Sequence, residues 1–304
     1  MRGVFVDAND SLAEIFERQR RNGDPDVRVH QDPNIKPEQW PAILGGAEIG
    51  VVDHTALPTA IAKRCTGLKH VVFLGTGARS YMNPDELAEL GISVHLIKGY
   101  GDTAVAESAI ALMWASARVL AQMDREMRAG NWLREDAMQL TGKTLGLIGF
   151  GGIAAEVARI AKGAGMRVIA WNRTPKQHPG VEFVSLDRLL ADSHVVSIHL
   201  LLNDETRGFI TREKIAAMRP GVILVNTARG AIVDEAAMIA ALKSGHIRHA
   251  GLDVFNIEPL PKDHPLTKIP NVTLSAHSAF RTPEASENLI QAAWEHCRRV
   301  ARGG

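Results

Sequence analysis

The sequence predicts an α/β protein built from two doubly wound, parallel-sheet domains. In the first third of the chain, short apolar runs, GVFVDA, IGVVDH, HVVFLG and ISVHLI, alternate with polar stretches of helical character, including residues 11–21 and 84–90. A second series, VIAW, VVSIHL, VILVNTA, HAGLDVF and VTLSAH, follows in the second half. Apolar runs of strand length that alternate with helices are typical of parallel sheets. The two series are separated by a glycine-rich turn, which begins at residue 149, near the middle of the chain.

Composition indicates a globular protein that acts on small molecules. At 304 residues and 45% hydrophobic content, the chain is long and apolar enough for two domains with buried cores. The net charge is +1 and no block of lysine or arginine occurs. This argues against a nucleic acid or an anionic membrane surface as partner. We therefore expect a small polar substrate.

Cysteine use and hydropathy disfavour other classes of protein. The two cysteines have neither a metal-binding nor a CxxC spacing, and no HExxH-like cluster occurs, so we predict no metal. The N-terminus, MRGVFVDAND, lacks the features of a signal peptide, and a cytoplasmic location is expected. The most apolar stretch, residues 103–123, contains Glu107 and Arg118, so it predicts a buried helix rather than a membrane span.

Two helices predict how the domains are connected. A helical stretch over residues 103–129 links the two series of strands, and a final helix over residues 283–302 is expected to return to the first domain. We therefore assign residues 1–101 and 283–304 to one domain and residues 102–282 to the other. The cleft between the domains is the expected active site.

The mid-chain glycine turn has the pattern of a phosphate-binding loop. The apolar strand TLGLI ends at Gly149, and a helix with regular apolar spacing follows. Gly149 permits the tight turn, Gly151 lets the backbone approach a pyrophosphate, and the small Ala154 lets helix and strand pack closely. Free N–H groups at the helix start would bind the phosphates. The residues expected to contact a dinucleotide there are Gly149, Gly151, Gly152 and Ile153.

The end of the next strand, residues 166–171, indicates which dinucleotide binds. An acidic side chain here would accept hydrogen bonds from the ribose 2′-OH, but the sequence continues with Asn172, Arg173 and Thr174. Arg173 offers planar donors suited to a 2′-phosphate, and its two neighbours add neutral hydrogen bonds. We predict NADP(H), with NAD as the alternative. The ordinary explanation of Arg173 is an exposed loop arginine.

Three segments in the second domain place ionisable side chains just after strands. They are residues 226–230, NTARG; residues 251–255, GLDVF, followed by Glu258; and residues 275–279, SAHSA. Ligands of open α/β sheets gather beyond the carboxyl ends of the strands. We therefore expect Arg229, Glu258 and His277 to face the same crevice as the glycine turn.

With these segments, the chain resembles the D-isomer-specific 2-hydroxyacid dehydrogenases. The resemblance also includes VAESAIALMWASAR at residues 105–118, VVSIHLLLNDETRG at residues 195–208 and HPL at residues 264–266. It implies a Rossmann cofactor domain inserted into a flavodoxin-like substrate domain, with residues 103–132 as an arm for homodimer formation. It also implies a substrate-binding arginine, a carboxylate and a catalytic histidine, which carry over to Arg229, Glu258 and His277.

The resemblance implies further cofactor contacts in the second domain. Asp253 matches an aspartate that hydrogen-bonds the nicotinamide carboxamide, and its ordinary explanation is a strand-end cap. Four more residues match segments that line the cofactor largely through backbone and shape: His199, Leu200, Thr227 and Ala228.

The implied reaction explains why these residue types occur together. When a hydride reaches the C2 carbonyl of a 2-oxo acid, negative charge develops on the oxygen, and a proton donor must neutralise it. His277 is the expected acid, or the base in the reverse direction, and Glu258 would favour its imidazolium form. Arg229 would bind the substrate carboxylate through two parallel hydrogen bonds. Taken singly, a capped loop histidine, a helix-end arginine and a solvated turn glutamate would be ordinary features.

The chain departs from the family pattern in its substrate loop. Residues 75–81 are GTGARSY, where the family usually has a glycine pair followed by Asp-Asn. The N–H groups of the two glycines, Gly75 and Gly77, would still bind a carboxylate, and Thr76, Gly77 and Arg79 are the expected substrate contacts. Arg79 replaces an acid and faces either a second anionic group of the substrate or solvent. Ser108 and Leu201 also differ from the common histidine and proline, so the substrate is left open.

The leading hypothesis is an NADP(H)-preferring reductase of small 2-oxo acids such as glyoxylate or hydroxypyruvate. An NAD-dependent enzyme that oxidises a D-hydroxy acid such as 3-phosphoglycerate is the alternative within this class. A non-catalytic dinucleotide sensor is the alternative outside it, and the intact set of arginine, glutamate and histidine argues against that alternative. Formate oxidation is disfavoured because that branch typically has glutamine where Glu258 stands.

Overall fold

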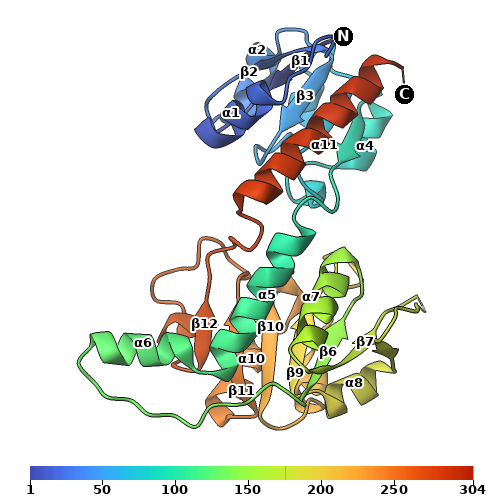
Figure 1. Cartoon of the computed structure of the whole chain (residues 1–304). Coiled ribbons are helices and arrows are strands. Elements are labelled where there is room, and N and C mark those ends of the chain that lie inside the picture. Colours follow the sequence, from blue (N-terminus) through green and yellow to red (C-terminus); the bar gives the residue numbers. More distant parts are fainter. Residues whose placement is uncertain (175, 304) are drawn as a thin grey trace. The chain divides into compact units, whose positions relative to one another are not determined.

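The structure, a computed structural model, describes residues 1–174 and 176–303 and divides into two compact units. Unit 1 comprises Met1–Gly101 and Arg281–Gly304, and unit 2 comprises Asp102–Phe280 (Figure 1). Residues 175 and 304 belong to the predicted domains but lie outside the described residues. The assignment of a substrate role and a cofactor role to separate domains remains a prediction.

Unit 1 is built around a five-stranded parallel sheet with the strand order β2-β1-β3-β4-β5. The strands are β1 (Arg2–Phe5), β2 (Asp26–Val29), β3 (Ile49–Val52), β4 (His70–Phe73) and β5 (Ser93–Leu96). The helices are α1 (Asp10–Arg18), α2 (Trp40–Leu44), α3 (Thr59–Ala62), α4 (Pro84–Glu89) and α11 (Pro283–Ala301), with short 3-10 helices η1 (Pro37–Gln39) and η2 (Ala78–Ser80). The strand order reverses between β1 and β3, which is the switch point where such sheets bind ligands.

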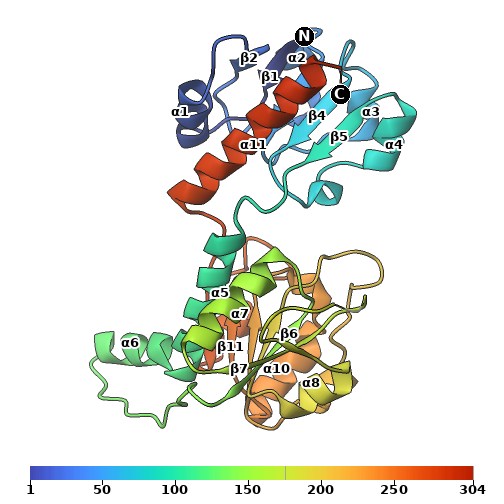
Figure 2. The ribbon, with the colours of Figure 1, turned by 45° about the vertical axis from the view of Figure 1, so that its right-hand side comes forward.

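The last helix, α11, packs within unit 1 because its apolar side chains recur at helical spacing. Leu289, Ile290 and Trp294 are buried in one core with residues of the sheet and of α1. The Trp294 ring stacks on Phe16 with 4.3 Å between centroids, and its Nε1–H donates to the Phe16 carbonyl oxygen at 2.9 Å. Helices α1 and α11 therefore lie side by side, as Figures 1 and 2 show.

Unit 2 contains a seven-stranded parallel sheet with the order β12-β11-β10-β9-β6-β7-β8. Its strands are β6 (Thr144–Ile148), β7 (Arg167–Trp171), β8 (Glu182–Phe183), β9 (Val195–Ile198), β10 (Val222–Asn226), β11 (Ile247–Leu252) and β12 (Val272–Leu274). Its helices are α5 (Asp102–Ala117), α6 (Leu120–Arg128), α7 (Gly152–Gly163), α8 (Leu186–Asp192), α9 (Arg212–Ala216) and α10 (Glu235–Ser244), with 3-10 helices η3 (Gly230–Ile232) and η4 (Pro265–Lys268). The two parallel sheets with their helices confirm the predicted fold class.

Helices cover both faces of the sheet in unit 2 because its strands are apolar on both sides. Val222 and Leu224 of β10 join one core with residues of α8 and α10, whereas Ile223 and Val225 join a second core with residues of α5 and α7. Figures 1 and 2 show α5 and α7 next to each other. Burial of both faces is typical of parallel sheets with near-continuous apolar strands.

The predicted helical stretch over residues 103–129 is helical over most of its length, but it consists of two separate helices, α5 and α6. Val119 between them has a left-handed φ of 56°, a conformation that a β-branched residue rarely adopts, so no glycine or proline marks the break. No single helix of residues 1–174 and 176–303 is long and apolar enough to cross a membrane. Helices α5 and α6, which are bent by 63° relative to each other, reach the length and apolar composition of a membrane span only when they are taken as a pair.

Candidate functional site

Five parallel strands of unit 2 end at one edge of the sheet, where the predicted site residues follow them. The register pairs Ile148 with Ile198, Asn226 with Leu252, and Leu252 with Leu274. Strands β6, β9, β10, β11 and β12 therefore finish on the same side of the unit. The residues that come directly after these strands are Gly149, His199, Thr227, Asp253 and Ser275.

His277 and Glu258 are in direct contact at this edge. Glu258 Oε2 lies 2.6 Å from His277 Nδ1, and Glu258 Oε1 accepts a hydrogen bond from the Phe255 N–H at 2.9 Å. The loop thus fixes the carboxylate, and the carboxylate fixes the tautomer of the ring, since Nδ1 must donate the proton that they share. The two side chains are 33% and 32% exposed. This arrangement leaves His277 Nε2 available to exchange a proton with a ligand.

Asp253 holds the loop that contains His277. Its side chain is fully buried, and its two carboxylate oxygens accept hydrogen bonds from the N–H groups of Ser278 and Ala279, each at 3.0 Å. Its carbonyl oxygen accepts from the His277 N–H at 2.7 Å. These bonds hold His277 at a left-handed φ of 48°, which is uncommon for a residue other than glycine. Asp253 is therefore a brace for the histidine loop, and its contact with a nicotinamide carboxamide remains a prediction.

Arg229 reaches the same edge through the turn after β10. Asn226 fixes this turn: its Oδ1 accepts from the Ala228 N–H and its Nδ2 donates to the Arg229 carbonyl oxygen, both at 3.0 Å. Arg229 Nη1 donates to the Ala228 carbonyl oxygen at 2.7 Å. Because a guanidinium group has five N–H donors, most of its donors remain available for an anion.

Gly230 brings the loop of Arg229 against the loop of Glu258. An added Cβ at Gly230 would lie 2.2 Å from the carbonyl carbon of Phe255 and 2.5 Å from the backbone nitrogen of Asn256. Backbone atoms cannot yield as a flexible side chain can, so only glycine fits here. The close approach joins the two segments that carry the arginine and the carboxylate.

The glycine turn between β6 and α7 forms an open cradle of backbone. Gly149 has a φ of +88°, and an added Cβ would lie 2.8 Å from the His199 carbonyl oxygen. Gly151 is the N-cap residue of α7, and no described atom lies within 4 Å of the place its Cβ would take. The first N–H groups of the helix, including those of Gly152 and Ile153, have no partner inside it. This geometry suits a phosphate group.

Asp102 is a carboxylate beside the glycine turn that sequence reasoning missed. An added Cβ at Gly152 would lie 1.8 Å from Asp102 Oδ2, so the carboxylate occupies the space next to that glycine. Burial, and to a smaller extent the Glu156 carboxylate, raise the pKa of Asp102. The positive end of a helix favours a carboxylate for the same reason that it favours a phosphate. The only indication of this carboxylate in the sequence was the acidic residue Asp102 itself, directly before the predicted helical stretch over residues 103–129.

The residues at this edge fit a dinucleotide. Besides the glycine cradle, the Thr227 hydroxyl is buried and has no hydrogen-bond partner among the described residues, which leaves it available to a ligand. Burial lowers the pKa of His199 to about 4, so its ring is neutral, and its Nε2 lies 2.9 Å from Ser197 Oγ. Leu200 adds apolar surface next to Gly149, as the 2.9 Å from its Cδ2 to an added Cβ indicates. No group of three or more His, Cys, Asp or Glu residues among 1–174 and 176–303 is arranged to hold a metal ion.

The loop after β7 gives Asn172 and Arg173 different surroundings. Asn172 braces the glycine turn, because its Oδ1 accepts from the Phe150 N–H at 3.1 Å and its Nδ2 donates to the Thr174 carbonyl oxygen at 2.7 Å. Arg173 is exposed and forms an ion pair with the exposed Glu205. Asn172 therefore keeps one N–H of its amide for a ligand, and Arg173 keeps the guanidinium donors that its ion pair does not use.

Lys176 is a second cation beside the glycine turn, and sequence reasoning missed it. Its Nζ donates to the Phe150 carbonyl oxygen at 2.6 Å. The signal was a lysine shortly after Arg173 in the same loop. Arg173 and Lys176 therefore both lie in the loop after β7, where the sequence lacks the acidic residue that would bind a ribose 2′-OH.

In unit 1, the predicted substrate loop follows β4 at the carboxyl edge of the sheet. The backbone N–H groups of Thr76 and Gly77 donate to no acceptor within the described part of the chain, so both are available for an anion. Arg79 Nη2 lies 2.8 Å from Asp85 Oδ2, and the two side chains are 68% and 74% exposed. The neighbouring carboxylate thus offsets the charge of Arg79.

His54 is a cation at the switch point of unit 1 that sequence reasoning missed. Its Nδ1 lies 3.1 Å from Asp53 Oδ2 and its Nε2 lies 3.0 Å from the Pro33 carbonyl oxygen, so each nitrogen faces an acceptor. The hydrogen bond with Asp53 raises the pKa of His54 to about 9. The buried Asp7 fixes this turn by accepting from the N–H groups of Asp53, His54 and Thr55. The signal was an Asp-His pair directly after an apolar strand.

A known family matches most of unit 2. The family model described as "D-isomer specific 2-hydroxyacid dehydrogenase, NAD binding domain" covers residues 110–279. This range contains the glycine turn and the strand ends with Arg229, Glu258 and His277.

Individual relatives are similar over most of the chain. A glyoxylate reductase of Korarchaeum cryptofilum is 39% identical over 238 residues, which are 74% of this chain and 72% of that protein. A D-3-phosphoglycerate dehydrogenase of Archaeoglobus fulgidus is 37% identical over 95% of this chain, and the chain spans only 56% of that protein's length. Among solved structures, an acyclic imino acid reductase in complex with NADPH and D-Arg has a TM-score of 0.84 at 29% identity, covering 96% of this chain and 94% of that one.

Proposed function

Because the chain belongs to the D-isomer specific 2-hydroxyacid dehydrogenase family, we propose that it transfers a hydride between NADP(H) and a small 2-oxo acid. The reduced product is a D-2-hydroxy acid. The observation that supports this most strongly is the contact between His277 Nδ1 and Glu258 Oε2, at the sheet edge where the loop of Arg229 also ends.

His277 is the proton donor in this proposal. As a hydride reaches C2 of the substrate, Nε2 donates its proton to the carbonyl oxygen, which becomes the hydroxyl group. Glu258 keeps Nδ1 protonated and stabilises the positive charge of the ring before the transfer. In the direction of oxidation, the same nitrogen accepts the proton. The nicotinamide ring, when bound, supplies or accepts the hydride.

Arg229 binds the substrate carboxylate and orients C2. Its free guanidinium donors suit a bidentate pair with a carboxylate, which fixes both position and rotation of a small acid. We also propose that the N–H groups of Thr76 and Gly77 bind the substrate carboxylate, since neither donates to another described acceptor. Asp253 acts as a positioning residue through the histidine loop.

The glycine turn and the loop after β7 bind the cofactor in this proposal. The N–H groups of Gly151, Gly152 and Ile153 would hold the pyrophosphate. Arg173 and Lys176 would hold a 2′-phosphate, which favours NADP(H), and the NADPH complex of the imino acid reductase relative adds support. The ion pair of Arg173 with Glu205 works against that preference and keeps NAD as the alternative.

Glyoxylate and hydroxypyruvate are the proposed substrates. The relatives include glyoxylate reductases and hydroxypyruvate reductases. A phosphorylated substrate is disfavoured because Asp85 already offsets the charge of Arg79, the one loop arginine that the sequence suggested for a second anionic group.

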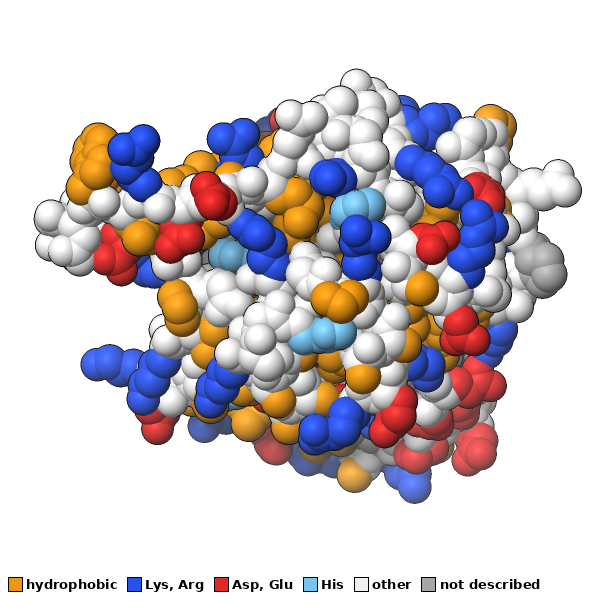
Figure 3. Space-filling model, turned by 90° about the horizontal axis from the view of Figure 1, so that it is seen from below, with side chains coloured by type: hydrophobic (Ala, Val, Ile, Leu, Met, Phe, Trp, Pro, Cys, Tyr) orange, Lys and Arg blue, Asp and Glu red, His pale blue; other side chains and the backbone are white. Residues whose placement is uncertain are grey.

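We further propose that α6 and the segment after it form a homodimer contact. Leu120, Met127 and Trp132 are 52%, 51% and 77% exposed, which is unusual for such large apolar side chains. Figure 3 shows apolar side chains on a part of the molecule that projects from the face in view. Light scattering at micromolar concentration tests this contact, and a monomeric mass would contradict it.

A matrix of substrates and cofactors tests the proposed reaction. Glyoxylate, hydroxypyruvate, pyruvate and oxaloacetate are each mixed with NADPH or NADH, and the nicotinamide absorbance is followed. We expect turnover with the first two acids and a higher kcat/KM with NADPH. A preference for NADH would favour the NAD alternative, and cofactor binding without turnover of any acid would favour a sensor.

A further inference from the structure

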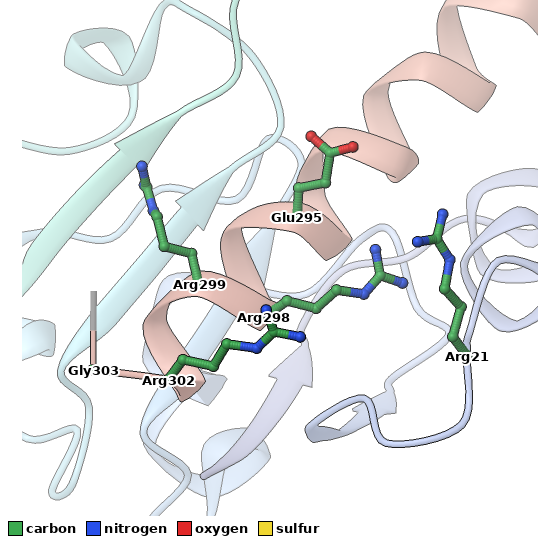
Figure 4. Close-up of a pocket in the computed structure, with 6 residues that line it drawn as sticks. All are labelled: Arg21, Glu295, Arg298, Arg299, Arg302 and Gly303. Atoms are coloured by element: carbon green, nitrogen blue, oxygen red, sulfur yellow. The ribbon is translucent and has the colours of Figure 1, made fainter.

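A basic cavity on unit 1 is lined by none of the residues proposed for catalysis. Its volume is about 520 Å³, and it is lined by Arg21, Glu295, Arg298, Arg299, Arg302 and Gly303 (Figure 4). All lining residues come from the C-terminal turns of α11 and from the loop between α1 and β2.

The cavity is at the opposite end of the sheet from the ligand loops of unit 1. Asp24, which binds Arg298, precedes β2 and so lies at the amino ends of the parallel strands. The loops with His54 and with Thr76 follow the carboxyl ends of β3 and β4. A ligand in this cavity would therefore occupy a separate site.

The cavity has an excess of positive charge that its own carboxylates do not offset. Among the described residues, the guanidinium groups of Arg21, Arg298 and Arg302 lie beside the carboxylates of Glu295 and Asp24. Arg299 is directed away from Arg21 and Arg298, and its Nη2 lies 2.8 Å from His296 Nδ1. Figure 4 shows the side chains of Arg21 and Arg298 directed toward one another. Like charges repel one another, and a bound anion would reduce the repulsion that Asp24 and Glu295 leave.

Arg298 is held in place in advance of any ligand. Its Nε and Nη2 donate to the two oxygens of Asp24 at 2.6 and 2.9 Å, and its guanidinium carbon lies 5.6 Å from the centroid of the Trp294 ring. Two of its five N–H donors are used, so three remain for an anion. Because its side chain is only 14% exposed, little rotamer freedom is lost on binding.

Arg21 and Arg302 complete the cavity with free donors. Neither guanidinium group donates a hydrogen bond within the described part of the chain, and both residues are exposed. The carbonyl end of α11 attracts basic side chains such as Arg302. That effect does not account for Arg21, which comes from a different segment and faces the same cavity.

We propose that this cavity is a binding site for a phosphate-bearing anion with at least two negative charges. Guanidinium groups pair with phosphate oxygens through parallel hydrogen bonds, and the free donors of Arg21, Arg298 and Arg302 suit an anion with several such oxygens. The ligand is either a free polyphosphate or the phosphate chain of a nucleotide, since both present the same chemistry. This site is independent of the proposed reaction.

Calorimetric titration of the full chain with pyrophosphate tests the site. The wild type is compared with the double variant Arg21→Ala/Arg302→Ala at constant ionic strength, because the glycine turn of unit 2 also offers a phosphate site. Arg298 is left intact, so that Asp24 keeps its partner. We expect the double variant to lose one binding event, or to bind at that site at least about tenfold more weakly, because each guanidinium donor to a phosphate is charged.

Arg64→Ala is the matched control, since Arg64 is an exposed arginine of unit 1 outside the cavity. It should bind pyrophosphate like the wild type. Parallel titrations with inorganic phosphate and with ATP identify the source: tighter binding of ATP than of pyrophosphate at the lost site indicates a nucleotide, and the reverse indicates a free polyphosphate. Equal binding by the wild type and the double variant, or equal weakening in Arg64→Ala, would overturn the proposal.

Discussion

Glu258 Oε2 lies 2.6 Å from Nδ1 of His277, and the same carboxylate accepts the Phe255 N–H through its other oxygen. The histidine is thus oriented by a group that is itself anchored to the backbone. This orientation leaves one defined nitrogen, Nε2, for chemistry. The predictions below follow from this contact and from the loops around it.

Glu258→Gln should lower kcat/KM for a 2-oxo acid by about 100-fold, because the amide neither carries the charge that stabilises the imidazolium nor fixes the tautomer as firmly. The measurement is the initial rate with hydroxypyruvate and NADPH. Asp263→Asn is the control, since Asp263 is an exposed acid in the same loop region. Equal rates in Glu258→Gln and the wild type would remove Glu258 from the mechanism.

Gly230→Ala should separate the loops of Arg229 and Glu258, because the added Cβ would meet the backbone of Phe255 at 2.2 Å. We expect a loss of about 1–3 kcal/mol in the free energy of unfolding, together with a lower kcat/KM. Denaturant unfolding and steady-state rates measure both. Gly163→Ala is the control, because no described atom outside its own helical turn lies within 4 Å of its Cβ position at the end of α7. It should stay within about 1 kcal/mol of the wild type.

Arg173→Ala should weaken NADPH binding by about tenfold or more and leave NADH binding nearly unchanged, because only NADPH has the 2′-phosphate. Glu205→Gln should have the opposite effect on NADPH, since it frees Arg173 from its ion pair. Dissociation constants from nicotinamide fluorescence test both. Asp204→Asn is the matched control for the charge change, and an equal effect of Arg173→Ala on both cofactors would contradict a role in phosphate binding.

His54 should make the stability of the protein depend on alkaline pH. Its pKa is raised from 6.5 to about 9 in the folded chain, so its contribution is fully present below pH 6.5 and is lost as pH rises through about 9. His54→Gln should therefore lower the Tm at pH 6 and have little effect at pH 10. A difference in Tm that is constant across this range would show that packing, not charge, accounts for the contribution.

The family and the fold class could be predicted from the sequence because they depend on local patterns. The glycine turn and the residues after β10, β11 and β12 are contiguous segments, and parallel strands bring their carboxyl ends together. Strands β2 and β8 were missed because Asp26–Val29 and Glu182–Phe183 are short and partly polar. The break at Val119 was missed because it lacks the usual glycine or proline.

Partners that are distant in the chain could not be predicted from the sequence. Asp253 was predicted as a cofactor contact, and the hydrogen bonds of its carboxylate to the backbone of Ser278 and Ala279 could not be predicted. Arg173 was predicted to bind a 2′-phosphate, and its ion pair with Glu205, 32 positions away in the chain, could not be predicted. The pair of Asp24 and Arg298 joins residues 274 positions apart. Which charged side chains form ion pairs depends on the folded structure and could not be predicted from the sequence.

The exchange of His277 for asparagine tests the central claim most directly. His277→Asn keeps a polar side chain of similar reach but removes the proton donor, and the cofactor loops are untouched. We predict a loss of about 10²- to 10⁴-fold in the rate of hydroxypyruvate reduction, with the NADPH dissociation constant unchanged. Retained turnover in His277→Asn, with the same cofactor affinity, would contradict the assignment of His277 as the acid.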